Sequence, residues 1–300
     1  MRVMLTNDDG IGAPGIIAMH DVLLGHGHGT GAGHGAGLGG AAAKPLATEL
    51  MVVAPLTVQS ATGHGVTFRT PLMTKRARLA EHGALAVAPG AEGGIGMAVD
   101  GRPADCTKLG VAALWPERVG AGSIPDVVIS GMNMGCNVGI NVLYSGTVAA
   151  AVEAAFLGVP AIAVSLHLGK EPADYRLAAK WAIEVIGRIM SSGGLRAHEC
   201  VSINLPRTTG LTVDSPTPEI AICPMNTHGS VDAFTRHTSP MGEVYYWSTG
   251  SPTDFHSTEA GSDVEHLMAG RITVTPLSYD MTDRGGMRIW EERLGKMVKF

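Results

Sequence analysis

The stretch RVMLTNDDGIGAPGIIAMHDVLL, residues 2–24, decides the fold class. It begins with a short apolar run at 2–6, turns at a segment rich in Asp, Gly and Pro, and continues as a helix over 15–24 with Pro14 just before its start. The run ELMVVAP at 49–55 is continuously apolar, which is typical of a parallel strand buried on both faces. Together these segments predict a βαβ unit.

A similar alternation of strands and helices continues to about residue 210. We expect strands at 84–90, 96–101, 125–131, 160–166 and 201–206, and helices at 104–115, 147–157 and 175–192. The last third changes character, because EIAICP, EVYYWS and RITVTPLSYD are predicted strands separated by polar loops, with no helix between them. The sequence therefore predicts an α/β core with a mostly parallel sheet over 1–210 and a β-rich C-terminal extension over 211–300. Antiparallel ribbons of that kind often serve contacts between subunits.

Composition and charge limit the class of partner. Of the 300 residues, 45% are hydrophobic and 16% are charged, as in a soluble globular protein with a large core. The net charge of −5 argues against binding to a nucleic-acid duplex or an anionic membrane surface, because both need clustered Lys and Arg. A small anionic substrate remains compatible with this charge, since a bound metal ion can supply local positive charge.

Neither a membrane span nor a secretory signal is expected. The apolar run at 147–166 contains Glu153 and is interrupted by Gly158 and Pro160, so a buried helix followed by a buried strand explains it better. The N-terminus lacks the apolar segment of a signal peptide. The four cysteines form no C-x-x-C pair, and free thiols in a reducing compartment are the simplest interpretation. We expect a cytoplasmic protein.

Residues 25–45 form a low-complexity segment dominated by glycine. So many glycines cannot bury enough apolar area to offset the cost of ordering them, and we expect a flexible surface insertion. Metal binding by His26, His28 and His34 is the alternative. It is disfavoured because a flexible glycine tract does not preorganise ligands.

Polar residues follow several of the predicted strands. Asn7-Asp8-Asp9-Gly10 follows the strand at 2–6, Gln59 to His64 follows the strand at 49–55, and Ser165 ends the strand at 160–166. The loop at 131–147 follows the strand at 125–131. Ligands of open α/β sheets bind at the carboxyl ends of strands, so these loops would converge on one rim if their strands are neighbours.

Asp8 and Asp9 are the first candidates for chemistry. Two adjacent carboxylates at a strand end repel each other, and a divalent cation is the simplest compensation. A helix cap or a turn explains the same residues without a metal, and from this motif alone both interpretations stay open. The nearby Asp, Ser and Asn side chains are oxygen donors, which suit Mg²⁺, Mn²⁺ or Ca²⁺ better than Zn²⁺.

The loop at 131–147 has features of an anion site. Asn137 and Ser145 are uncharged donors, and Ser145-Gly146-Thr147 opens an Ala-rich helix whose first N–H groups and dipole favour a phosphate. Ser145 as a plain helix N-cap is the alternative. An acidic metal site beside a neutral anion site is a more specific combination than either part alone.

Five motifs, in order along the chain, resemble the SurE family (survival protein E). They are TNDDGIGAPGI, VVAP with QSATGH, GRPADCTKLG, the run from PDVVISGMNMG to GVPAIAVSL, and TDF with RITVTPLSYDMTD. The resemblance covers residues 1 to about 283. It departs from the usual family pattern at Leu56, at Arg102, in the Gly/His tract at 25–45 and around GSDVEH at 261–266.

This resemblance implies a Rossmann-like, three-layer α/β core, with a C-terminal extension that assembles a homodimer or homotetramer. It implies a metal-dependent acid phosphatase that acts as a 5′/3′-nucleotidase on nucleoside monophosphates, with one Mg²⁺ or Mn²⁺ per subunit. Carried onto this chain, the metal ligands are Asp8, Asp9, Ser60 and Asn133. The phosphate-binding positions are Asn137, Ser145, Gly146 and Thr147.

The expected mechanism is metal-assisted hydrolysis of a phosphomonoester, with Asp8 or Asp9 orienting the water and taking its proton. His64 is a weaker candidate for protonating the leaving alkoxide. Two alternatives are a phosphatase with an aspartyl-phosphate intermediate and a non-catalytic nucleotide-binding module. The contiguous aspartates count against the first, which usually has Asp-x-Asp. The second would not need paired carboxylates.

Overall fold

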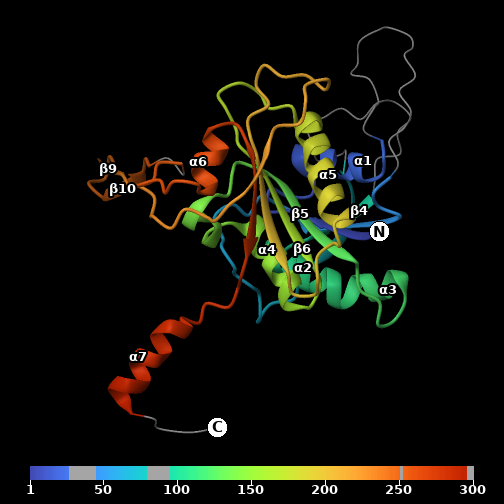
Figure 1. The fold of residues 1–300 in the computed structure, drawn as a ribbon, viewed down its shortest axis with the longest axis horizontal. Helices are drawn as coiled ribbons and strands as arrows, with labels where there is room; N and C mark the ends of the chain where they lie inside the picture. The colour runs from blue at the N-terminus through green and yellow to red at the C-terminus, as the bar shows by residue number, and fades with distance from the viewer. Residues whose placement is uncertain (27–44, 80–94, 251–252, 296–300) are drawn as a thin grey trace.

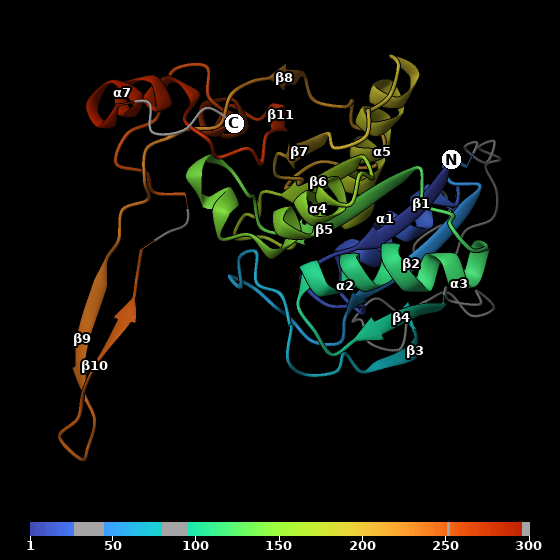
Figure 2. The same cartoon turned by 90° about the horizontal axis from the view of Figure 1, so that it is seen from below.

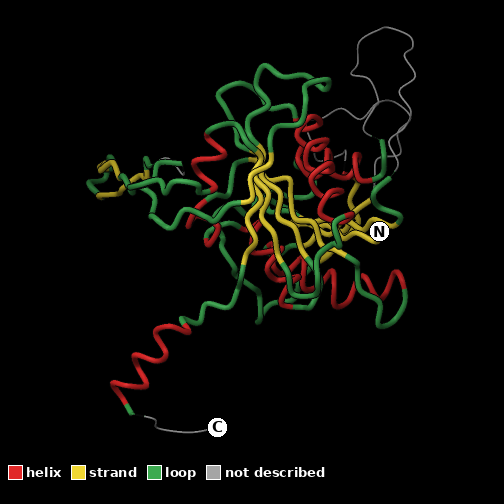
Figure 3. Tube along the Cα trace, in the orientation of Figure 1, coloured by secondary structure: helices red, strands yellow, loops and turns green. Residues whose placement is uncertain are grey.

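A nine-stranded sheet runs through the molecule in the order β3-β4-β2-β1-β5-β6-β7-β11-β8, seen as the yellow strands of Figure 3. The computed structural model describes residues 1–26, 45–79, 95–250 and 253–295. The strands are β1 (Arg2–Thr6), β2 (Glu49–Pro55), β3 (Thr74–Arg78), β4 (Ile95–Val99), β5 (Val127–Met134), β6 (Ala161–Leu166), β7 (Cys200–Leu205), β8 (Ile220–Ile222) and β11 (Ile272–Leu277). Strands β4, β2, β1, β5, β6 and β7 are parallel, whereas β3 and β11 pair antiparallel with β4 and β7.

Helices cover both faces of the sheet (Figure 1). On one face lie α1 (Pro14–Leu23) and α5 (Tyr175–Ser191); on the other lie α2 (Pro103–Leu109), α3 (Trp115–Val119) and α4 (Gly146–Phe156). Successive side chains of a strand point to opposite faces. Val3 and Leu5 accordingly join the core under α1 and α5, whereas Met4 joins the core under α2 and α4. The predicted three-layer α/β architecture is confirmed.

Most predicted elements of the first two thirds are found, with two differences of detail. The helix expected at 104–115 is α2 followed by a π-helical turn at Gly110–Leu114 and then α3, so it continues to Val119. The antiparallel strand β3 was not predicted, because its residues are mostly charged and exposed. The strand expected at 84–90 and most of the tract at 25–45 lie outside the described residues.

The last third does not lack helices, so that prediction was wrong. Helix α6 (Asp263–Met268) precedes β11, and α7 (Arg284–Leu294) follows it. The short α6 is stabilised by a Ser262 N-cap that the sequence pattern did not reveal. Strands β8 and β11 complete the central sheet, so the C-terminal third is built into the same sheet as the N-terminal part.

Two arms project from the body (Figure 2). One is the antiparallel hairpin of β9 (Phe234–Thr238) and β10 (Val244–Ser248), and the other is α7. All ten strand residues of the hairpin are exposed, and α7 has no buried residue. Large apolar side chains on these arms, including Phe234 and Trp247 at 63% exposure and Trp290 at 57%, lie open to solvent.

No helix among the described residues combines the length and apolar character needed to cross a bilayer. The run at 147–166 forms α4 and the strand β6, as predicted, and both are almost entirely buried. All four cysteines are free thiols.

Candidate functional site

The order in which the chain adds strands to the sheet reverses at β1. Strand β2 lies on one side of β1, and β5 lies on the other. Such a switch point leaves a crevice outside the carboxyl ends of the strands, where ligands of open α/β sheets bind. The segment Asn7-Asp8-Asp9 follows β1 directly at this position, and all three residues are buried.

Asp8 lies against the N-terminus of α4. The hydroxyl of Thr147 donates to Asp8 Oδ1. Burial raises the pKa of Asp8, while the Thr147 hydroxyl and the backbone N–H groups of Thr147 and Gly146 lower it. The close approach depends on Gly146, since a Cβ there would lie 2.9 Å from both Cβ and Oδ2 of Asp8. Part of the helix N-terminus is therefore occupied by a carboxylate of the protein itself.

Asp9 is joined to the end of β5. Its Oδ2 accepts the backbone N–H of Met134 at 2.8 Å. Burial and, to a smaller extent, the charge of Asp8 raise the pKa of Asp9 to about 6, although the Met134 N–H opposes this. Neither Asp8 nor Asp9 forms an ion pair with any described residue.

Asn133 and Ser60 lie on segments bound directly to this pair. Asn133 immediately precedes Met134, and its Nδ2 donates to the carbonyl of Gly135 at 2.8 Å. Ser60 is exposed in the turn after β2. The residue before it, Gln59, donates its backbone N–H to the Asp8 carbonyl at 2.8 Å. The structure thus brings the segments that carry the four predicted metal ligands to one part of the rim.

The predicted phosphate-binding positions lie along the same rim of the sheet. Ser145 Oγ accepts the N–H of Val148 at 3.1 Å, so Ser145 does act as the N-cap of α4. The Thr147 hydroxyl is committed to Asp8. Asn137 Nδ2 donates to Ser165 Oγ at 2.8 Å, which places Asn137 beside the end of β6.

His64 is separated from the aspartates along α4. Its Nε2 lies 2.7 Å from Glu153 Oε2, and its ring stacks on Phe156 at 5.0 Å. Because an α-helix rises 1.5 Å per residue, Glu153 and Phe156 lie about 10 and 15 Å along α4 from its N-terminus. Lys108 Nζ holds the other oxygen of Glu153 at 2.7 Å. This placement counts against His64 as the acid for a leaving group bound beside Asp8.

Three residues near the site were not predicted. Tyr175 lies close enough to Asp9 for the aspartate charge to add to the effect of burial, and both raise the tyrosine pKa. Asn204 forms two hydrogen bonds to the backbone of Asn137. Asp263 accepts the N–H of Gly139 at 2.8 Å. Position at the end of a buried strand could have indicated Asn204, but nothing local marks Asp263.

The donor set fits a hard divalent cation. Two adjacent buried carboxylates without a cationic side chain partner need a positive charge when ionised. Among the described residues there is no cluster of three or more His, Cys, Asp or Glu side chains, so Ser and Asn oxygens would have to complete the ligand set. Oxygen-only ligands favour Mg²⁺ or Mn²⁺ over Zn²⁺.

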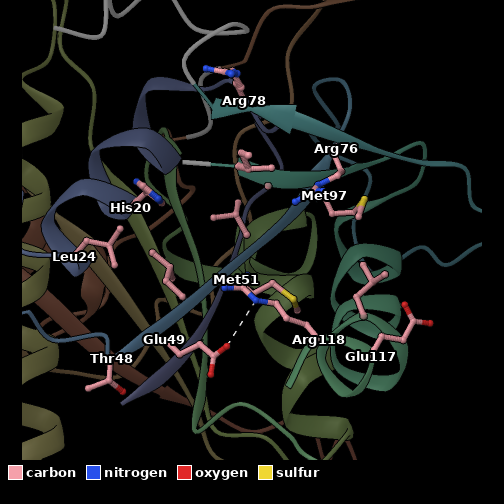
Figure 4. Close-up of a pocket in the computed structure, with 15 residues that line it drawn as sticks. His20, Leu24, Thr48, Glu49, Met51, Arg76, Arg78, Met97, Glu117 and Arg118 are labelled. Carbon is pink, nitrogen blue, oxygen red and sulfur yellow. Dashed lines mark ion pairs between the residues drawn. The ribbon is translucent and has the colours of Figure 1, made fainter. Parts of the chain in front are cut away.

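A separate cavity of about 1240 Å³ lies elsewhere in the molecule (Figure 4). Its lining includes Thr48 and Glu49 at the amino end of β2 and Ile95 at the start of β4. Arg118 reaches toward Glu49 across it, with Nε 3.7 Å from Oε1. None of the predicted site residues lines this cavity, so its size does not identify it as the reaction site.

Comparisons with known proteins agree with the fold and the motifs. The model of the family described as survival protein SurE matches residues 3–230. The 5′-nucleotidase SurE 1 of Thermus thermophilus is 37% identical over 287 residues, covering 95% of this chain and 94% of the relative. The 5′-nucleotidase SurE of Pelotomaculum thermopropionicum is 35% identical over 302 residues, covering 100% and 96%. The crystal structure of the SurE protein from Aquifex aeolicus superposes with a TM-score of 0.71 at 26% identity, covering 98% of this chain and 100% of that one. This chain belongs to the SurE family.

Proposed function

We propose that this protein is a 5′-nucleotidase, a metal-dependent phosphomonoesterase that converts nucleoside monophosphates to nucleoside and phosphate. The observation that carries the proposal is the paired burial of Asp8 and Asp9 at the switch point of the sheet, 4% and 8% exposed and without a cationic partner among the described residues. The names of the full-length relatives support the same activity. Hydrolysis of 3′-monophosphates belongs to the proposal as a secondary activity.

One divalent cation, Mg²⁺ or Mn²⁺, would be held by Asp8, Asp9, Ser60 and Asn133. When bound, it would polarise the phosphoryl group and make water more acidic. The protein prepares this position by fixing Asp8 through Thr147 and Asp9 through the Met134 N–H. Both bonds orient the carboxylates before substrate binds. Preorganisation of this kind lowers the activation barrier because the groups need not rearrange during the reaction.

The other residues bind and orient the phosphate. Asn137 and Ser145 offer uncharged donors, and the N-terminus of α4 at Gly146 and Thr147 adds its dipole. Asp8 or Asp9 orients the attacking water and takes its proton. Charge that develops on the phosphoryl oxygens is then stabilised by donors that are already in place.

Phosphate release from a panel of nucleoside 5′- and 3′-monophosphates tests this function. The protein is treated with EDTA and assayed before and after adding back Mg²⁺ or Mn²⁺. We expect no release after EDTA and recovery with either ion. Absence of release from every substrate with both ions, together with retained nucleotide binding, would instead favour a non-catalytic binding module.

A phosphatase with an aspartyl-phosphate intermediate is the competing enzyme class. The contiguous carboxylates disfavour it, because that class usually has Asp-x-Asp. Acid quenching during turnover with a ³²P-labelled substrate distinguishes the two. If the wild-type protein carries ³²P after the quench and Asp8→Asn does not, the reaction proceeds through a covalent intermediate and direct hydrolysis is excluded.

We further propose that the protein assembles as a homodimer or homotetramer through its arms. The β9–β10 hairpin and α7 expose Phe234, Trp247 and Trp290 to solvent, and exposed apolar surface of this kind commonly marks an interface. A long, fully exposed two-stranded ribbon also gains little stability alone. Burial against a second copy would account for both arms.

A cytoplasmic location is part of the same proposal. All four cysteines are unpaired, and Cys106, Cys200 and Cys223 are buried as thiols. Thiols without disulfides are typical of a reducing compartment.

A further inference from the structure

The loop at 131–147, called the rim loop below, carries the proposed phosphate donor Asn137. The segment that matters here is Asn137, Val138 and Gly139. Each of these three residues is fixed by a different contact from outside the loop. Two of the contacts come from Asn204 and Asp263, which are separated from the loop by 67 and 124 residues. Both side chains are 1% exposed.

Asn204 fixes the backbone of Asn137 from both sides. Its Oδ1 accepts the Asn137 N–H at 2.8 Å, and its Nδ2 donates to the Asn137 carbonyl at 3.0 Å. These paired bonds hold the peptide groups on either side of the Asn137 Cα in the manner of a strand partner. The Asn137 side chain can then be aimed independently, with Nδ2 on Ser165 Oγ at 2.8 Å.

Asp263 fixes the other end of the segment. Its Oδ2 accepts the Gly139 N–H at 2.8 Å, while its Oδ1 accepts those of Asn226 at 2.9 Å and Val264 at 2.8 Å. The carboxylate therefore joins the rim loop to the start of α6 and to the segment at residue 226. Three N–H donors compensate much of the cost of burying this charge.

The packing around Gly139 and Val138 leaves little room for another arrangement. Gly139 has φ +58°, and a Cβ there would lie 2.9 Å from the Phe255 ring and 3.0 Å from the Asn226 carbonyl oxygen. Val138, 1% exposed, packs with Val264 and Leu267 of α6. The loop is thus held at three consecutive residues, just where it enters the short 3₁₀-helix Gly139–Leu143.

We propose that Asn204 and Asp263 are positioning residues for the substrate phosphate, acting through Asn137. Neither belongs to the predicted metal or phosphate ligands, and neither touches the reacting atoms. They would set the position of the Asn137 amide, so their loss would weaken phosphate binding more than it slows the chemical step. This inference rests on the proposed function, because it assigns the role to the phosphate site of that reaction.

Asp263→Asn and Asn204→Asp test the inference with near-isosteric changes. Asp263→Asn replaces one acceptor oxygen by an amide that faces backbone donors. Asn204→Asp keeps the acceptor for the Asn137 N–H but places an oxygen against the Asn137 carbonyl. Asp126→Asn is the matched control, since Asp126 accepts the backbone N–H of Arg2 at 2.8 Å at the opposite end of the sheet.

For each full-length variant the readouts are kcat, KM, competitive inhibition by inorganic phosphate, the metal concentration for half-activation, and Tm. Loss of a backbone hydrogen bond to the Asp263 carboxylate, or an unpaired Asn137 carbonyl against the new carboxylate in Asn204→Asp, predicts a rise of about 10-fold in both KM and the phosphate inhibition constant. We expect kcat and half-activation by metal to change much less. Asp126→Asn should lower Tm without changing either phosphate parameter.

Two outcomes separate this inference from the proposed function. A wild-type protein with no phosphatase activity would refute the function, and calorimetric titration of inorganic phosphate into the metal-loaded protein would then test the positioning role alone. An active wild type whose Asp263→Asn and Asn204→Asp variants lose only Tm, with KM and phosphate inhibition unchanged, would reduce both residues to a structural role. If Asp263→Asn fails to fold, Asn204→Asp alone decides between these results.

Discussion

The hydroxyl of Thr147, in the first turn of α4, donates to Oδ1 of Asp8, the second residue after β1. The two residues are 139 positions apart in sequence, and both are buried. This bond joins the two motifs that the sequence separates, the acidic turn and the start of the Ala-rich helix. It also places the helix N-terminus against the carboxylate pair, and several predictions depend on it.

Replacing Thr147 by Val removes the hydroxyl while keeping the branched shape of the side chain. Asp8 would lose one donor and gain freedom to rotate. A hydrogen bond to a charged group contributes about 1.5–3 kcal/mol, so kcat/KM should fall by roughly 10- to 100-fold. Thr147→Ser retains the hydroxyl and should keep most of the activity. Equal losses in Val and Ser variants would show that shape, and not the bond, matters.

Gly146→Ala should disable the site by steric contact. Its Cβ would lie 2.9 Å from Asp8 Oδ2 and 3.0 Å from Pro103 Cγ, so the carboxylate must move. We expect a loss of metal-dependent activity of at least about 10-fold and a lower Tm. Gly187→Ala in α5 is the control, because nothing outside the local helix backbone lies within 4 Å of the added Cβ. That variant should be slightly more stable than the wild type, by about 0.5–1 kcal/mol from helix propensity.

The metal-free protein should show a pH-dependent stability that originates at Asp9. Burial raises the Asp9 pKa to about 6, above its value in the unfolded chain, so the folded state binds this proton more tightly. The contribution to stability is then fully present below about pH 4 and is lost as pH rises through about 6. Thermal unfolding in EDTA between pH 4 and 8, compared with Asp9→Asn, measures it. The difference in Tm should grow in favour of Asp9→Asn as pH rises; a constant difference would contradict the assignment.

Substituting an exposed apolar residue of the β9–β10 hairpin should weaken the association of subunits. Trp247 on β10 is 63% exposed, and Trp247→Lys should lower the mass measured by analytical ultracentrifugation if the hairpin joins subunits. Ile124, 46% exposed at the opposite end of the sheet beside β5, provides the control variant Ile124→Lys. An unchanged mass for Trp247→Lys, or an equal decrease for both variants, would contradict assembly through this arm.

The central part of the fold could be predicted because its strands are buried on both faces. Continuous apolar runs such as 49–55 have few alternatives in a protein of this size, and short Gly- and Pro-rich turns mark their ends. The elements at the periphery of the fold could not be predicted in this way. β3 carries mostly charged residues, and α6 is a six-residue helix whose stability comes from Ser262 and from packing against Val138. Such elements depend on long-range contacts that leave no periodic pattern.

The same distinction applies to the site. Asp8, Asp9 and Asn133 lie at strand ends, so their convergence followed from parallel pairing of β1 with β5. The contacts that orient them did not follow. The sequence indicated Thr147 as part of an anion site, whereas its hydroxyl holds Asp8. His64 lies in a polar rim loop, yet its ring turns away to Glu153 and Phe156. Spacing locates a loop on the rim but does not fix the direction of its side chains.

The proposed hydrolysis requires a divalent cation held by Asp8 and Asp9. Titration of Mn²⁺ into EDTA-treated wild type and Asp9→Asn, followed by phosphate release from a nucleoside 5′-monophosphate by the same samples, tests this directly. We expect one Mn²⁺ per wild-type chain with activity that follows occupancy, and neither binding nor activity in Asp9→Asn. Full phosphate release by metal-free wild type, or unchanged binding and activity in Asp9→Asn, would contradict it.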